Sequence, residues 1–96
     1  MSYQVVYSPR AADDLPNIFD WISTAASDSI ALGFVERIET YCRGFGDFPH
    51  RGTKRDDLRP GLRLIGFERR ATILFDVTDT RVTILRVLYG GREVGL

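Results

Sequence analysis

Three short runs of apolar and β-branched residues lie close together in the second half of the chain and limit what it can fold into. They are LRLIGF (62–67), ATILFDV (71–77) and VTILRVLY (82–89), and each has the content that is typical of a strand. Only the segments ERR and TDTR separate them, and gaps of this length suit tight hairpins. We therefore expect three strands joined in antiparallel order.

The first half of the chain carries a short strand signal followed by two helical patterns. The strand signal is YQVVYS (3–8), and Ser8 is a preferred helix N-cap residue, with Pro9 at the first helical position. The apolar residues that follow at helical spacing are Ala12, Leu15, Phe19 and Ile22. A second helix starts near Ser27 or Asp28, and its apolar positions are Ile30, Phe34, Ile38, Tyr41 and Phe45. The short segment between the two patterns predicts an antiparallel helical hairpin.

Pro16 interrupts the first helical pattern. A proline there removes the hydrogen bond to the carbonyl of Ala12, four residues earlier. We expect a kink at this point, or a new helix start capped by Asp13 or Asp14.

These elements predict an α+β fold of order β-α-α-β-β-β, in which the helical hairpin packs on a small antiparallel sheet. A length of 96 residues fits one domain, so we assign residues 1–96 to a single domain. The polar segment 48–61 is expected to be a loop. No apolar run approaches the ~18 residues of a membrane helix, and the first residues lack a signal-peptide core. We therefore expect a cytoplasmic protein with no membrane partner.

Pairing across the TDTR turn predicts where Arg86 lies. The implied pairs are Val77 with Val82, Phe75 with Ile84, and Ile73 with Arg86. If the helices cover the other face, formed by Leu74, Leu85 and Val87, then Arg86 emerges on the open face. This placement favours a role for Arg86 in a site.

The sequence offers few residues for catalysis or metal binding. A metal site needs about three convergent ligands, and the single histidine, His50, has no carboxylate pair at ligand spacing. The single cysteine, Cys42, follows the apolar Tyr41 position, which favours a half-buried packing residue over a thiol–imidazole pair with His50. The motif Gly44–Gly46 neither follows a strand nor opens a helix, so it is no dinucleotide fingerprint. We assign no catalytic residue, no metal and no cofactor.

Charge is distributed unevenly, although the net charge is zero. Residues 1–50 hold three Arg against seven Asp and Glu, whereas residues 51–96 hold ten Arg and Lys against six Asp and Glu. A basic half suits nucleic acid or an acidic partner, and attraction between the two halves of a solvated surface explains it equally well. A metal-free ribonuclease built from these cations would need an acid and a base, for which only His50 and Tyr89 are candidates.

Four segments together resemble one protein family. They are YSPRAADDL (7–15), FPHRGT (48–53), DDLRPGLR (56–63) and ILRVLYGGRE (84–93). In combination they are similar to ParE toxins, which belong to the RelE/ParE superfamily of bacterial type II toxin–antitoxin systems. The resemblance covers nearly the whole chain and implies the same element order.

This resemblance implies a toxin that inhibits DNA gyrase and is neutralised by a ParD-like antitoxin, whose ribbon-helix-helix dimer binds DNA. The toxin itself would meet DNA only indirectly, through the antitoxin or gyrase. The alternative is a RelE-like enzyme that cleaves messenger RNA in the ribosome, using lysines and arginines with a late tyrosine. Arg63 and Arg92 match arginines of RelE-type enzymes. However, the lysine pair expected before the second strand is missing, since only Lys54 lies there, and no tyrosine follows Arg92. A third possibility is a member that has lost toxicity and only binds antitoxin.

Two features depart from typical ParE sequences, which have histidine where this chain has Tyr89 and GAR where it has GGR. Because a phenol can serve as an acid, Tyr89 keeps the ribonuclease alternative open.

We expect two binding surfaces. The residues expected to bind the target are Arg59, Arg63, Arg86, Tyr89 and Arg92. The helical hairpin covers the sheet with one stripe, and large apolar side chains off that stripe would form a patch for an amphipathic antitoxin tail. These residues, expected to bind the antitoxin, are Ile18, Trp21, Leu32, Val35 and Phe45.

Overall fold

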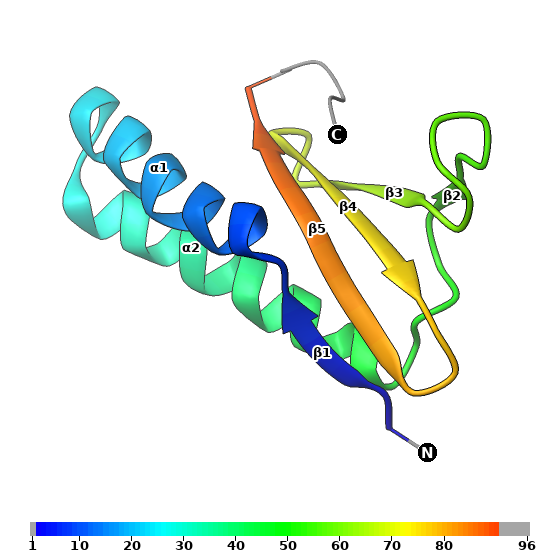
Figure 1. The fold of residues 1–96 in the computed structure, drawn as a ribbon. Helices are drawn as coiled ribbons and strands as arrows, with labels where there is room; N and C mark the ends of the chain where they lie inside the picture. Colours follow the sequence, from blue (N-terminus) through cyan, green and yellow to red (C-terminus); the bar gives the residue numbers. More distant parts are fainter. Residues whose placement is uncertain (1, 91–96) are drawn as a thin grey trace.

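The computed structural model describes residues 2–90 and shows two helices packed on one face of a five-stranded sheet (Figure 1). The elements are β1 (Gln4–Tyr7), α1 (Pro9–Ala25), α2 (Asp28–Arg43), a 3-10 turn η1 (Gly44–Gly46), β2 (Thr53–Lys54), β3 (Arg63–Phe67), β4 (Ala71–Val77) and β5 (Arg81–Tyr89). The predicted α+β fold and its two-helix, sheet-covering arrangement are confirmed. The strand β2 was not predicted, because two exposed polar residues carry no hydrophobic alternation.

The strands follow the order β1-β5-β4-β3-β2 across the sheet. Strands β2 to β5 are antiparallel to their neighbours, as expected, whereas β1 pairs with β5 in parallel. The sheet is therefore mixed rather than wholly antiparallel. Since β1 pairs with β5, the first strand of the described chain lies beside the last one and forms one edge of the sheet (Figure 1).

Helix α1 begins where the sequence predicts and continues through Pro16 as one element. Ser8 is the N-cap, and its Oγ accepts a hydrogen bond from the Ala11 N–H at 3.1 Å. Both Pro16 and Ala12 are exposed, so water can hydrate the Ala12 carbonyl that proline leaves without a partner. The alternative of a new helix start at Asp13 or Asp14 is therefore wrong.

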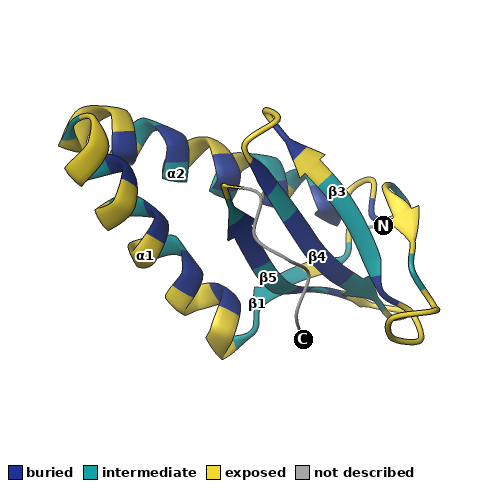
Figure 2. Ribbon diagram, turned by 90° about the horizontal axis from the view of Figure 1, so that it is seen from above, coloured by how far each residue is buried: buried dark blue, intermediate teal, exposed yellow. Residues whose placement is uncertain are grey.

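The main core lies between the helices and one face of the sheet. The buried sides of α1, α2, β4 and β5 face each other in Figure 2, whereas the outer sides of the helices are exposed. The residues at its centre are Ile18, Ile22, Phe34, Ile38, Phe45, Ile73, Phe75, Val82, Ile84 and Val87. A second, smaller cluster of Leu62, Leu74 and Leu88 lies apart from this core.

An irregularity in the β4–β5 pairing changes the expected register. The pairs Val77 with Val82 and Phe75 with Ile84 are confirmed, but Leu74 then pairs with Arg86, and Ile73 with Val87. One extra residue on β5, Leu85, thus lies between the two regular stretches, as in a β-bulge. The expected Ile73–Arg86 pair is wrong. The assumed helix-covered face is wrong as well, because Leu74 belongs to the small cluster while Val87 belongs to the main core.

The single cysteine lies in the main core and not in a reactive pair. Cys42 is fully buried and hydrogen-bonds the Tyr7 hydroxyl, while the His50 ring lies edge-on to Tyr3 at 6.0 Å between ring centroids. Burial raises the pKa of the Cys42 thiol to about 11, and burial also raises the pKa of the Tyr7 phenol. Cys42 is therefore a neutral packing residue at pH 7, more deeply buried than the sequence suggested.

Alkylation of Cys42 by iodoacetamide at pH 8 should be at least ~100-fold slower in the folded protein than in urea, because a pKa raised by about two units removes most of the thiolate. Mass spectrometry of time points measures both rates. The raised pKa also predicts that the free energy of unfolding falls as the pH rises past about 9, and that this fall is shallower in Cys42→Ala. Equal alkylation rates in both states would contradict the burial of this thiol.

Candidate functional site

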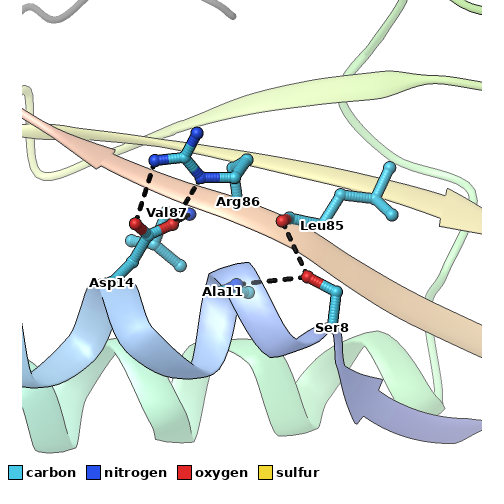
Figure 3. A network of polar contacts seen from close by, with 6 residues as sticks. All are labelled: Ser8, Ala11, Asp14, Leu85, Arg86 and Val87. Atoms are coloured by element: carbon cyan, nitrogen blue, oxygen red, sulfur yellow. Dashed lines mark hydrogen bonds and ion pairs between the residues drawn. The ribbon is translucent and has the colours of Figure 1, made fainter. Parts of the chain in front are cut away.

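Arg86, the cation expected on an open face, is instead held against α1 by a carboxylate. Asp14 accepts hydrogen bonds from Arg86 Nε at 2.8 Å and Nη2 at 3.0 Å, and from the Val87 N–H at 2.9 Å (Figure 3). The side chain of Asp14 is only 11% exposed and that of Arg86 only 15%. These hydrogen bonds hold the pKa of the Arg86 guanidinium above its ordinary value. Register pairs Arg86 with Leu74, on the sheet face away from the main core, as expected. The expectation that Arg86 is open to a partner is wrong, because Asp14 of α1 reaches past the edge of β5 and binds its guanidinium.

Two polar side chains of the α1 segment complete the hydrogen bonds of β5 where β1 ends. The last β1–β5 pair is Tyr7 with Ile84. Beyond it, Ser8 Oγ donates to the Leu85 carbonyl at 2.9 Å and Asp14 accepts from the Val87 N–H (Figure 3). Backbone groups at a strand edge need such partners when they are buried. Arg86 and Asp14 therefore position α1 on the sheet.

The other residues expected to bind the target are spread over the molecule. Arg59 is exposed, with its Nη2 3.9 Å from an Asp76 oxygen. Arg63 is half-buried and donates to the Arg51 carbonyl at 3.2 Å. Arg92 lies outside the described residues.

Tyr89 is separated from Arg63 by the length of a strand. Its ring packs on the helix side, with centroids 5.8 Å from Trp21 and 5.4 Å from Phe34. Along β4, Tyr89 pairs with Ala71 and Arg63 pairs with Phe75, a separation of four residues or ~13 Å. The structure thus does not bring these two residues together.

Two cavities do gather cationic residues. One, of about 270 Å³, is lined by Ser8, Pro9, Arg10, Arg59, Leu85 and Arg86, so it joins two of the expected residues to Arg10, which sequence reasoning missed. The other, of about 190 Å³, is lined by His50, Lys54, Asp56, Gly61, Arg63 and Val77. Both suit an anionic group, because arginine and lysine side chains converge on a small volume.

The residues expected to bind the antitoxin divide into core and surface. Ile18 and Phe45 are buried in the main core, at 4% and 0% exposure, so their assignment to an exposed patch is wrong. Ile18 lies on the inward stripe of α1 with Ala11, Asp14 and Ile22, while Phe45 belongs to η1, where the helical phase of α2 no longer applies. Trp21 and Leu32 are exposed, at 45% and 52%, and Val35 is half-buried.

A row of aromatic rings connects the exposed Trp21 to the core. Successive centroids are 5.2 to 5.8 Å apart along the series Trp21, Tyr89, Phe34, Phe67, Tyr41 and Phe45. Two cavities lie along this row. The smaller, about 200 Å³, is lined by Ile22, Ile30, Phe34, Arg37, Glu68, Arg70 and Tyr89, and the larger, about 370 Å³, by Glu36, Arg37, Thr40, Tyr41, Phe67 and Glu68.

We call these two cavities together the aromatic groove. It is a concave, largely apolar surface with a charged rim, as peptide-binding grooves are. The sequence held a signal for it, since Tyr41 and Phe67 lie on elements predicted to face each other. Tyr89 was assigned to the other surface from its position in the family motif, whereas its ring packs beside Trp21 and Phe34.

Within residues 2–90 no group of three or more His, Cys, Asp or Glu side chains is arranged to hold a metal ion. Neither α1 nor α2 is long and apolar enough to cross a membrane.

Comparison with known proteins identifies relatives over nearly the whole chain. A family model described as "ParE toxin of type II toxin-antitoxin system, parDE" matches residues 5–94. Toxin ParE3 of Caulobacter vibrioides is 30% identical over 87 residues, which span 91% of this chain and 86% of that protein.

Two solved structures share the fold. A chain of the chromosomal ParDE toxin–antitoxin system from P. aeruginosa superposes with a TM-score of 0.80 at 25% identity, covering 92% of this chain and 96% of that one. A chain of the toxin–antitoxin complex RelBE2 from Mycobacterium tuberculosis superposes with a TM-score of 0.67 at 19% identity, covering 94% of this chain and 100% of that one. The second likeness shows the fold alone.

Replacing Asp14 with alanine should lower the free energy of unfolding by about 3 kcal/mol, because the Arg86 guanidinium and the Val87 N–H lose a nearly buried acceptor. Urea unfolding followed by circular dichroism measures this change. Asp13→Ala, which removes an exposed carboxylate from the same helix, should change the value by less than about 0.5 kcal/mol. An unchanged unfolding midpoint in Asp14→Ala would show that the network does not hold α1 in place.

Proposed function

Because this chain belongs to the ParE family of type II toxins, we propose that it inhibits DNA gyrase by binding it and that a ParD-like antitoxin neutralises it. The match of the ParE family model to residues 5–94 and the similarity to Toxin ParE3 support this proposal. One observation of the structure supports inhibition by binding rather than by cleavage of a phosphodiester. The two donor groups of the Arg86 guanidinium already bind Asp14. A guanidinium that already binds Asp14 in bidentate fashion does not offer that fork to a phosphate.

We propose that the chain is not an enzyme. Cleavage of a phosphodiester requires a base, an acid and a cationic cradle at one phosphate. The phenol of Tyr89 lies among aromatic rings on the helix side, while Arg59 and Arg63 lie toward the other end of the sheet. The protein then acts by occupying a surface of its target, which needs shape and charge but no proton transfer.

Target binding is assigned to the cationic side of the molecule. Arg59 is exposed and lines the cavity of about 270 Å³ with Arg10, and Arg63 lines the cationic cavity of about 190 Å³. Both suit forked contacts to carboxylates or phosphates of gyrase or its bound DNA. Arg86 acts by positioning these elements, and Arg92 remains a proposed contact. A target that handles DNA places the protein in the cytoplasm.

Antitoxin binding is assigned to the helix side. The ParD-like partner, a ribbon-helix-helix dimer, would lay its C-terminal tail along the aromatic groove. Trp21, Leu32 and Val35 line neither cavity of the groove, so they would contact a further part of the partner on the helices. This arrangement leaves any DNA contact to the antitoxin and gyrase. The ParDE structure from P. aeruginosa that this fold matches is a toxin–antitoxin system, which supports a partner of this kind.

A second candidate function rests on a different observation. His50, Lys54 and Arg63 line one cavity of about 190 Å³ together with Asp56, which unites an imidazole with two cations. This set is what a RelE-like, ribosome-dependent messenger RNA endonuclease would use if His50 moved the proton. The fold it shares with the RelBE2 structure is compatible with this alternative.

Expression of the protein alone should cause filamentation and a DNA-damage response, and purified protein should make gyrase accumulate cleaved DNA. Arg59→Ala should reduce this effect at least ~10-fold with an unchanged unfolding midpoint, because it removes an exposed fork. His50→Ala separates the two candidate functions and should retain gyrase inhibition, because that activity needs no proton transfer. Codon-specific cleavage of messenger RNA on programmed ribosomes, lost in His50→Ala, would establish the endonuclease instead.

Replacing Trp21 and Val35 together with serine should weaken antitoxin binding by ~2 kcal/mol or more, the scale of a binding hot spot. Isothermal titration calorimetry on folded protein measures this loss. Phe48→Ser is the control, because Phe48 is an aromatic residue even more exposed than Trp21 that lies outside the two helices, and its loss should leave affinity unchanged. Wild-type affinity in the double variant would remove the helix side from the antitoxin interface.

A further inference from the structure

The aromatic groove is crossed by a single ion pair. Arg37 of α2 donates from Nε to one Glu68 oxygen at 2.8 Å and from Nη2 to the other at 3.0 Å. Both residues line both cavities of the groove, so the pair divides one aromatic surface into compartments of about 200 and 370 Å³. Without this pair the row from Tyr89 to Tyr41 would form one continuous trough.

The pair is well placed to open. Its side chains are 54% and 37% exposed, so water competes for both partners and the pair contributes little to stability. Glu68 belongs to the turn between β3 and β4, where Glu68 and Arg69 have φ values of +52° and +57°. Such a two-residue turn fixes the backbone of the hairpin. Opening therefore requires only rotation of two side chains and no movement of the sheet.

Two further arginines lie along the same row. Among residues 2–90, neither Arg70 nor Arg51 forms an ion pair, although Arg70 lines the smaller cavity. The Arg51 guanidinium lies over the rings of Tyr41 and Phe45, 5.5 and 5.3 Å from their centroids. The groove itself is lined by two arginines, Arg37 and Arg70, and by two carboxylates, Glu36 and Glu68, while Arg51 lies over the rings at its far end. A partner whose apolar side chains are accompanied by a carboxylate for Arg37 fits this pattern.

We propose that the Arg37–Glu68 pair is a latch that an acidic amphipathic helix of the antitoxin displaces. The helix lays its apolar side chains on Phe34, Phe67 and Tyr41, and one of its carboxylates takes the place of Glu68 on Arg37. The fork of Arg37 is thus satisfied before and after binding, and the released Glu68 carboxylate faces water and Arg70. This inference rests on the proposed antitoxin partner and specifies its chemistry.

The test measures the affinity of the full-length antitoxin that protects cells from this toxin, by calorimetry, for four variants. Glu68→Gln should tighten binding about 3- to 10-fold, because Arg37 no longer has to exchange partners. Arg37→Gln should weaken binding at least 10-fold, and Arg37→Lys should weaken it less, since it keeps the charge but loses the fork. In the Arg37→Gln background, Glu68→Gln should change affinity by less than 2-fold, because Glu68 acts through Arg37.

Arg43→Gln is the matched control, because Arg43 lies on the same helix, donates to Thr40 and lines neither cavity. It should bind within 2-fold of the wild type. Weaker binding by Glu68→Gln, or the same effect of that change in both backgrounds, would overturn the latch while leaving the antitoxin assignment intact. Absence of binding by the wild type would overturn the proposed partner itself, and light scattering that shows Glu68→Gln to dimerise would assign the groove to a second copy of this chain.

Discussion

One carboxylate, that of Asp14, holds the two layers of this protein together. It lies on the inward stripe of α1 and accepts three hydrogen bonds from two consecutive residues of β5. The strand β1 ends beside Ile84, so the remaining edge of β5 would otherwise present unpaired backbone groups to the underside of a helix. The rest of the geometry follows from this contact. It sets how α1 crosses the sheet, and α1 in turn places α2 over the aromatic row.

Most of the fold could be predicted because its elements have regular periods. Helical spacing and the Ser8 and Ser27 caps located both helices, and the lengths of the two turns located β3, β4 and β5 almost to the residue. The features that were missed interrupt the regular spacing of a helix or a strand. The bulge at Leu85 shifts the side chains that follow it, η1 ends the phase of α2 before Phe45, and β2 is too short to carry a pattern.

The candidate sites were harder to predict than the fold for the same reason. The register of Arg86 was wrong because strict alternation was extended through a bulge, and its contact with Asp14 was missed because it joins residues 72 positions apart. A signal that was overlooked is the acidic residue within the apolar stripe of α1, since a buried carboxylate requires a cationic partner. Trp21 and Leu32 were correctly expected to be exposed, because each lies off the apolar stripe of its own helix and helical spacing alone predicts that position. Cations on loops, such as Arg59, needed the tertiary structure.

The parallel pairing of β1 with β5 bears on when the protein acquires its fold during synthesis. The first and last strands pair residues as far apart as Gln4 and Arg81, and the Asp14–Arg86 contact spans 72 positions. Contacts this distant in sequence form late, because the chain between them must first be ordered. A nascent chain that lacks β5 has neither the sheet edge for β1 nor the anchor for α1. The sheet edge and the anchor of α1 can therefore form only after β5 has been synthesised.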